Sequence, residues 1–169
     1  MEALTHAVVL AVAGLLGTPA AMGASEATDP SIWQAEEWTD LEGYSWTASE
    51  LEGRVVLLDF WATWCPPCLA ELPQLRALHE DRQDDGLLIV GIALDAIDRR
   101  GLRSFLLRHG IEWPQVHRPD GLRSEVARRF GVDALPVTVL VDRRGRVVAR
   151  NLRGEALARV VDSLIQFER

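Results

Sequence analysis

The sequence predicts an α/β fold in which one mixed β-sheet is flanked by helices on both faces. Three apolar runs support this prediction, because each has the length and composition of a buried strand; they are Val55–Leu58, Leu87–Leu94 and Val137–Val141. Segments with helical periodicity follow the first two runs, and a hairpin and a helix close the chain. This order of strand, helix, strand, helix, hairpin and helix implies a mixed sheet covered on both sides.

The first 24 residues predict a signal peptide or an N-terminal anchor. Residues 7–16 form an uncharged apolar run that is too short for a comfortable membrane span, and small residues follow it up to position 24. Glu2 and His6 depart from the basic start that is typical of signal peptides. We expect an exported, periplasmic or extracytoplasmic protein, with residues 7–17 as a tether if they are retained. An N-terminal core helix is the alternative.

Residues 25–37 contain Ser, Thr, Asp and Pro and predict a linker, so the folded domain is expected to span residues 38–169. It should open with a short hairpin over Trp38–Trp46 that turns at Glu42-Gly43. A helix ending near Gly110, an extended segment at residues 113–117 and helical turns at residues 121–130 fill the centre. The last helix is expected over Glu155–Phe167, where apolar residues recur at helical spacing.

Charge and length restrict the possible classes of function. The chain has 169 residues and a formal net charge of −7, so it suits a single domain and offers no basic surface for nucleic acid. We expect a monomer.

The two cysteines of the chain, Cys65 and Cys68, form a C-x-x-C motif between a strand and a helix expected over Pro66–Gln83. Unpaired N–H groups and the partial positive charge of a helix N-terminus stabilise a thiolate, so Cys65 is predicted to be the nucleophile. Pro66 and Pro67 suit the first helical turn, where a missing N–H costs least. Half of a zinc site and an inert buried pair are the alternatives, but zinc needs about four ligands. We expect neither a metal nor an organic cofactor.

Asp59 interrupts the first apolar strand. A carboxyl group that is buried there has a raised pKa, and it could take the proton of Cys68 when a mixed disulfide resolves. A strand-end aspartate that faces solvent or bonds to nearby backbone is the alternative.

The segment Asp59-Phe60-Trp61-Ala62, followed by Trp64-Cys65-Pro66-Pro67-Cys68, resembles the active-site signature of the thioredoxin superfamily. The Pro-Pro pair is more similar to exported TlpA/ResA-type thiol–disulfide oxidoreductases than to thioredoxin. The resemblance covers about residues 38–167. It includes the N-terminal hairpin, a central insert between Leu94 and Val132, the segment Leu135-Pro136-Val137-Thr138 and the turn at residues 142–145.

This resemblance implies roles for several residues near the cysteines. Pro136 matches a cis-proline, whereas an ordinary trans proline at the start of a strand is the alternative. Leu135 would line the substrate groove beside it, and Trp64, Pro66 and Pro67 would form part of the docking surface. Trp61 shields the disulfide or is plain core.

Glu71 lies three residues after Cys68 and matches a glutamate that tunes the cysteines in ResA-type proteins. A solvated acid that suits the helix dipole is the equal alternative. The implied function is reduction of protein disulfides outside the cytoplasm, including in cytochrome c maturation. The implied partners are protein thiol or disulfide substrates and a membrane-borne thiol electron donor.

Three other functions remain open at this point. A thiol peroxidase would share the sheet, but the proline upstream of the peroxidatic cysteine is missing. A copper-delivery protein typically uses C-x-x-x-C and a distal histidine, for which His109 or His117 would have to serve. A redox-inert interaction domain is the third.

Overall fold

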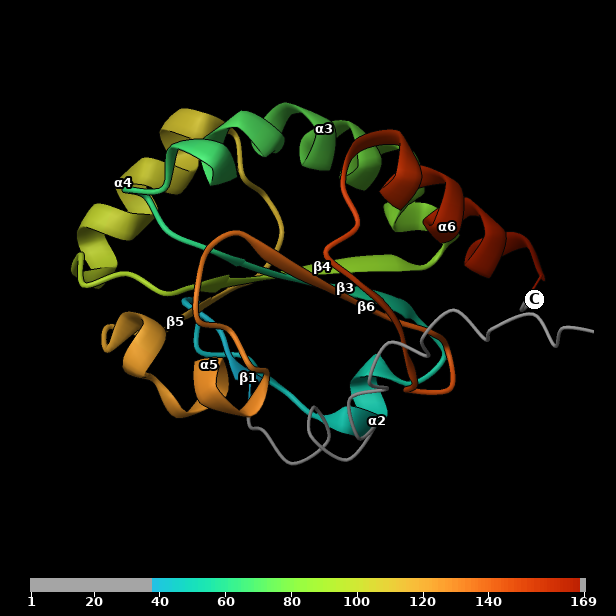
Figure 1. The fold of residues 1–169 in the computed structure, drawn as a ribbon, viewed down its shortest axis with the longest axis horizontal. Helices are drawn as coiled ribbons and strands as arrows, with labels where there is room; N and C mark the ends of the chain where they lie inside the picture. The colour runs from blue at the N-terminus through green and yellow to red at the C-terminus, as the bar shows by residue number, and fades with distance from the viewer. Residues whose placement is uncertain (1–37, 168–169) are drawn as a thin grey trace, which may run out of the picture.

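The computed structural model describes residues 38–167 of the protein (Figure 1). The predicted signal peptide or anchor at residues 1–24 and the linker at residues 25–37 lie outside the described residues. Within the described range, no helix combines the length and the apolar character that crossing a membrane requires.

A five-stranded mixed sheet forms the centre of the domain, in the order β5-β4-β3-β6-β7. Its strands are β3 (Val55–Trp61), β4 (Leu87–Ala93), β5 (Gln115–His117), β6 (Val137–Val141) and β7 (Val147–Arg150). β3, β4 and β5 run parallel, whereas β6 pairs antiparallel with both β3 and β7. The three apolar runs of the sequence therefore become the three inner strands, which confirms the predicted mixed sheet.

Helices cover both faces of this sheet, as predicted (Figure 1). On one face lie α3 (Pro66–Arg82), α4 (Arg99–His109) and α6 (Gly154–Phe167). On the other face lie α2 (Ala48–Leu51) and α5 (Glu125–Arg129), and the short 3₁₀ helices η1 (Gln83–Asp85) and η2 (Gly121–Arg123) complete the connections. The central insert consists of α4, β5, η2 and α5.

Side chains of β3 alternate between two separate cores, because successive residues of a strand point to opposite faces. Val55, Leu57 and Trp61 pack with α3, α4 and α6, in the cluster that also contains both cysteines. Val56, Leu58 and Phe60 pack with Trp38 and with α5 in the second cluster. By the same alternation, Asp59 belongs to the face that carries α3.

The N-terminal hairpin pairs β1 (Trp38–Thr39) with β2 (Ser45–Trp46), as predicted. Asp40 holds its turn, since its carboxylate accepts hydrogen bonds from the backbone N–H groups of Glu42 and Tyr44 and from the indole of Trp46. The backbone N–H of Leu41 donates to the carbonyl of Gln115 in β5 at 2.8 Å. The hairpin is thereby fixed to the outer strand of the sheet.

Candidate active site

Cys65 and Cys68 form a disulfide at the start of α3, with an S–S distance of 2.01 Å. Cys65 is the N-cap residue, and its Sγ accepts a hydrogen bond from the backbone N–H of Cys68 at 3.3 Å. Pro66 and Pro67 occupy the first helical positions, as the sequence predicted. In the reduced protein, the same N–H and the helix dipole would favour a thiolate on Cys65.

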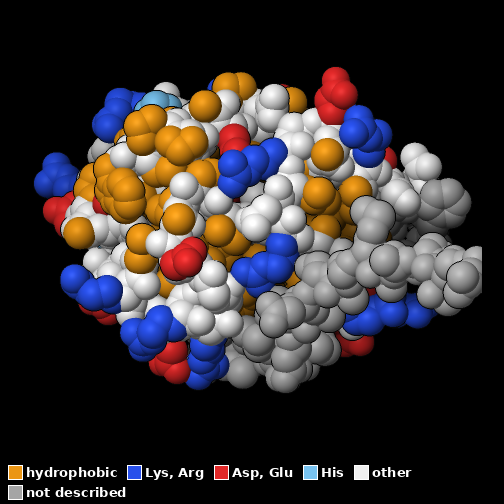
Figure 2. Space-filling view, viewed as in Figure 1, with side chains coloured by type: hydrophobic (Ala, Val, Ile, Leu, Met, Phe, Trp, Pro, Cys, Tyr) orange, Lys and Arg blue, Asp and Glu red, His pale blue; other side chains and the backbone are white. Residues whose placement is uncertain are grey.

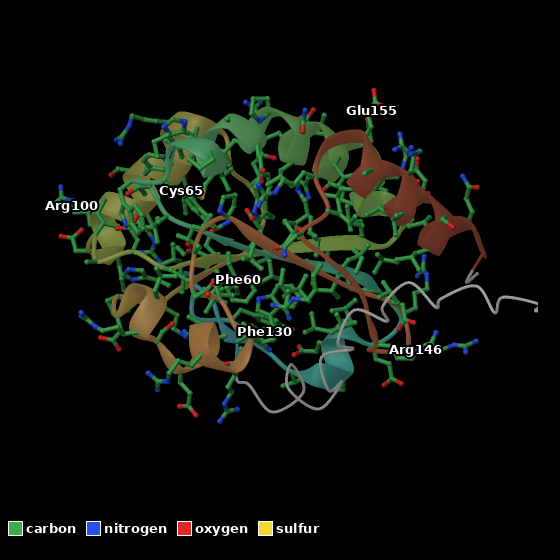
Figure 3. All side chains as sticks on the ribbon, in the orientation of Figure 1. Phe60, Cys65, Arg100, Phe130, Arg146 and Glu155 are labelled. Carbon is green, nitrogen blue, oxygen red and sulfur yellow. A yellow bond between two sulfur atoms is a disulfide. The ribbon has the colours of Figure 1, made fainter. Side chains whose placement is uncertain are left out.

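An apolar surface lies around the disulfide. Trp64 is 59% exposed, and Pro66 and Pro67 are also exposed, whereas each cysteine is only 3% exposed. Hydrophobic side chains gather on the face of the molecule where Cys65 lies (Figures 2 and 3). A partner that reaches the sulfurs must therefore pass over this surface. Trp61, by contrast, is buried core, and its indole donates to the Gln115 side chain at 2.9 Å.

The peptide bond between Leu135 and Pro136 is cis, as the resemblance implied, so the trans alternative is wrong. Leu135 is half-buried and packs against the cluster that contains Cys65 and Cys68. The cis-proline loop thus packs against the same hydrophobic cluster as the disulfide.

Asp59 is buried with 3% exposure, so the solvent-facing alternative is wrong. Burial and, to a smaller extent, the negative charge of Glu71 raise the pKa of its carboxyl group, Arg153 lowers it, and together these effects bring the pKa to about 7. Its neighbours across the sheet are Gly91 in β4 and Thr138 in β6, and neither carries charge. A carboxyl group with this pKa can exchange a proton near neutral pH.

Glu71 is not a fully solvated acid, because its side chain is only 17% exposed and pairs with Arg153. The Nε of Arg153 lies 3.1 Å from Oε1 of Glu71. Burial raises the pKa of Glu71, although Arg153 lowers it. Arg153 also donates from Nη2 to the carbonyl oxygen of Pro136 at 2.6 Å, and so contacts two predicted site residues at once.

Asp95 holds the loop before Cys65 in place. Its buried carboxylate accepts hydrogen bonds from the backbone N–H of Thr63 at 2.7 Å, from the Thr63 hydroxyl at 2.6 Å and from the N–H of Ile97 at 3.0 Å. The Nε2 atom of His117 lies 2.8 Å from the Asp95 carbonyl oxygen. His117 therefore supports this loop, and among residues 38–167 no three His, Cys, Asp or Glu side chains gather as metal ligands.

Sequence reasoning missed Arg153, Asp95 and Gln115. Asp95 had a usable signal, since a carboxylate directly after a buried parallel strand lies at the sheet edge where ligands and active-site loops gather. Gln115 had only a weak signal in its position on a short apolar strand. Arg153 had none, because nothing in the local sequence sets it apart from the other arginines.

A profile of the AhpC/TSA family matches residues 31–150 of the chain. A thiol–disulfide oxidoreductase ResA of Bacillus thuringiensis is 31% identical over 117 residues, which are 69% of this chain and 65% of that protein. A ResA of Bacillus cereus is 32% identical over 129 residues, which are 76% of this chain and 71% of that protein. The chain thus spans slightly less than two thirds of the length of the first of these relatives and slightly more of the second.

Solved structures show the same likeness. A thiol–disulfide oxidoreductase from Bacteroides fragilis is 30% identical with a TM-score of 0.69, covering 76% of this chain and 96% of its own. A thiol:disulfide interchange protein described as DsbE, from Chlorobium tepidum, is 27% identical with a TM-score of 0.64, covering 77% of this chain and 89% of its own. The chain therefore belongs to the AhpC/TSA family within the thioredoxin superfamily, in the branch of the ResA-type proteins.

Proposed function

We propose that the protein is a thiol–disulfide oxidoreductase that reduces disulfides of other proteins through Cys65 and Cys68. The observation that supports this most directly is the pair itself: a disulfide at the first turn of α3, on the same sheet face as a buried carboxyl group whose pKa is about 7. A nucleophile and a proton acceptor on one face are what disulfide exchange requires.

In the first step the Cys65 thiolate attacks one sulfur of a substrate disulfide. A Cys65–substrate disulfide forms, and the other substrate sulfur leaves as a thiolate that takes up a proton. In the second step Cys68 gives its proton to Asp59, and its sulfur bonds to Cys65. The remaining substrate sulfur leaves with the bonding electron pair and is protonated. The dithiol has lost two electrons, and the substrate disulfide has gained them.

The docking surface for this exchange would be formed by Trp64, Pro66, Pro67 and Leu135, beside the cis-Pro136 peptide. Exposed apolar side chains around two nearly buried sulfurs suit a protein substrate, because a partner chain would cover them during the reaction.

We place this activity outside the cytoplasm, with a membrane-borne thiol donor that returns the pair to its reduced form, and with cytochrome c maturation as one use. The ResA and DsbE names of its relatives support this placement, and the apolar run at residues 7–16 fits export.

The test combines turnover and trapping. The wild-type protein should speed the reduction of insulin disulfides by dithiothreitol, and Cys65→Ser should abolish this acceleration. Cys68→Ser should retain the mixed disulfide with its natural partner, which mass spectrometry identifies. A wild type that is no faster than Cys65→Ser would contradict the proposed activity, and equal trapping by Cys65→Ser and Cys68→Ser would contradict the assigned roles of the two cysteines.

A further inference from the structure

We propose that Arg153 is a positioning residue for the second step, because it joins Glu71 on the active-site helix to the backbone of the cis-proline loop. This inference rests on the proposed exchange chemistry. Arg153 would act on the resolving attack of Cys68 by fixing the charges and the backbone around Asp59, without touching the reacting sulfurs.

The guanidinium group makes two contacts with different atoms. Its Nε lies 3.1 Å from Oε1 of Glu71, and its Nη2 lies 2.6 Å from the carbonyl oxygen of Pro136. A planar guanidinium holds these donors at fixed angles, so both contacts together define the distance between α3 and the cis-proline loop. A lysine has a single ammonium and cannot reproduce this fork.

The backbone that carries Arg153 is itself anchored beside Asp59. The hydroxyl of Thr138 donates to the carbonyl of Leu152 at 2.9 Å, and the N–H of Asn151 donates to the carbonyl of Thr138 at 2.8 Å. Thr138 is the residue of β6 that pairs with Asp59 of β3. The segment before α6 is therefore hydrogen-bonded to β6, the strand that lies beside Asp59.

The charges around Asp59 come from few groups. α3 contributes Glu71, the segment before α6 contributes Arg153, and the pairing residues Gly91 and Thr138 carry no charge. Glu71 raises the pKa of Asp59, and Arg153 lowers the pKa of both carboxyl groups. Removing Glu71 and removing Arg153 should therefore move the pKa of Asp59 in opposite directions.

A groove lies beside the ion pair between Glu71 and Arg153. It has a volume of about 250 Å³, lies between α3 and α6, and is lined by Glu71, Arg153 and Thr138 together with apolar side chains. Hydrophobic side chains are visible between these two helices in Figure 2. Glu71 and Arg153 therefore meet at a groove on the surface, whereas Asp59 does not line it.

Arg82 provides a matched control for Arg153. Its Nε lies 2.6 Å from Oδ1 of Asp162, so it also connects α3 to α6 along the same groove. It is 14 residues beyond Cys68, or about 21 Å further along the helix axis. Arg82→Met thus removes a bridge of the same type without changing the surroundings of Asp59.

The experiment follows the second step alone. Each reduced full-length variant, in excess, reacts with an aromatic disulfide whose thiolate is coloured. The first thiolate released reports the attack of Cys65, and the second reports the attack of Cys68. The rate of the second release is measured between about pH 5 and 9, where it should rise with a midpoint set by Asp59.

Arg153→Met should move this midpoint upward by about half a pH unit, and Glu71→Gln should move it downward. Arg82→Met should have the same midpoint as the wild type. Arg153→Lys should restore the midpoint, since the charge returns, yet it should still react more slowly than wild type with insulin disulfides because the contact to Pro136 is lost.

The inference would be overturned if the pH midpoint of the second release were the same in Arg153→Met, Arg82→Met and wild type. It would also be overturned if both Met variants shifted this midpoint by the same amount. The aromatic disulfide reacts with any accessible dithiol. Shifted midpoints without any reduction of insulin would therefore reject the proposed function and leave the role of Arg153 standing.

Discussion

The two faces of β3 have different compositions, although one strand supplies both. The face toward α5 carries Val56, Leu58 and Phe60, which pack against Trp38 and Phe130. Figure 3 shows Phe60 and Phe130 together on one side of the sheet and Cys65 on the other. The face toward α3 has Asp59 in place of one apolar residue, and the disulfide lies on the same side of the sheet, as do Glu71 and Arg153, whose charges act on Asp59.

This difference shows how the domain separates stability from chemistry. Burying a carboxyl group is unfavourable, and β3 does so only at Asp59, whose pKa is raised to about 7. The opposite face of β3 carries only apolar side chains, so its packing can stabilise the sheet without affecting proton transfer.

Phe130→Ala should lower the free energy of unfolding by about 3–5 kcal/mol, because it leaves a cavity among fully buried aromatic rings. Phe130 is 1% exposed, and its ring centroid lies 5.3 Å from that of Phe60. Denaturant unfolding measures the loss, and Phe130→Leu should show a smaller one. The pH midpoint of the second exchange step should be unchanged in both variants, and a shift would mean that the two faces are coupled.

Asp59→Asn should stabilise the oxidised protein above neutral pH. The pKa of Asp59 is raised from an ordinary 3.8 to about 7, so the folded protein keeps a proton that the unfolded chain has released. The stability that this protonated carboxyl allows is fully present below about pH 4 and is lost as the pH rises to about 7, by about 4 kcal/mol at most. The variant should lack this loss, which denaturant unfolding at several pH values will show.

The same variant should slow the second exchange step about a hundredfold at neutral pH, because Cys68 loses its proton acceptor. An Asp59→Asn protein whose stability keeps the wild-type pH dependence would refute the raised pKa. One that exchanges at the wild-type rate would refute the role of Asp59 in proton transfer.

Trp64→Ala should change the free energy of unfolding by less than about 0.5 kcal/mol, since the side chain is 59% exposed. It should nevertheless slow the reduction of insulin disulfides while leaving the reaction with a small aromatic disulfide unchanged. Val148→Ala is a suitable control, because Val148 is 43% exposed on β7. Equal rates with insulin for both variants would exclude Trp64 from the docking surface.

Local patterns in the sequence were sufficient to predict the inner strands, the start of α3 and the C-x-x-C motif. The apolar runs became the inner strands because strands buried on both faces need continuous apolar residues, and the two prolines marked the start of α3. The cis peptide at Pro136 followed from resemblance, since no local pattern distinguishes it from a trans proline. The roles assigned to Cys65, Cys68, Asp59 and Glu71 stay predictions.

Contacts between distant segments were beyond local reasoning. Arg153 reaches Glu71 across 82 positions of sequence, and Asp95 reaches Thr63 across 32. Each depends on the order in which the strands assemble, so the residues look ordinary until the sheet is formed. Glu71 was ambiguous for the same reason, because its partner lies on another element.

The outer rims of the sheet determine where a second polypeptide can add its backbone. At one edge of the sheet, the backbone N–H of Leu41 in the N-terminal hairpin occupies the carbonyl of Gln115. At the other edge, the basic residue Arg146 precedes β7, and Arg150 ends it. Sheet edges that are covered or charged oppose the addition of another strand, and therefore oppose self-association into fibrils. Both edges of the sheet are thus protected from aggregation, which leaves the proposed docking surface around Trp64 and Leu135 as the place where a partner chain approaches.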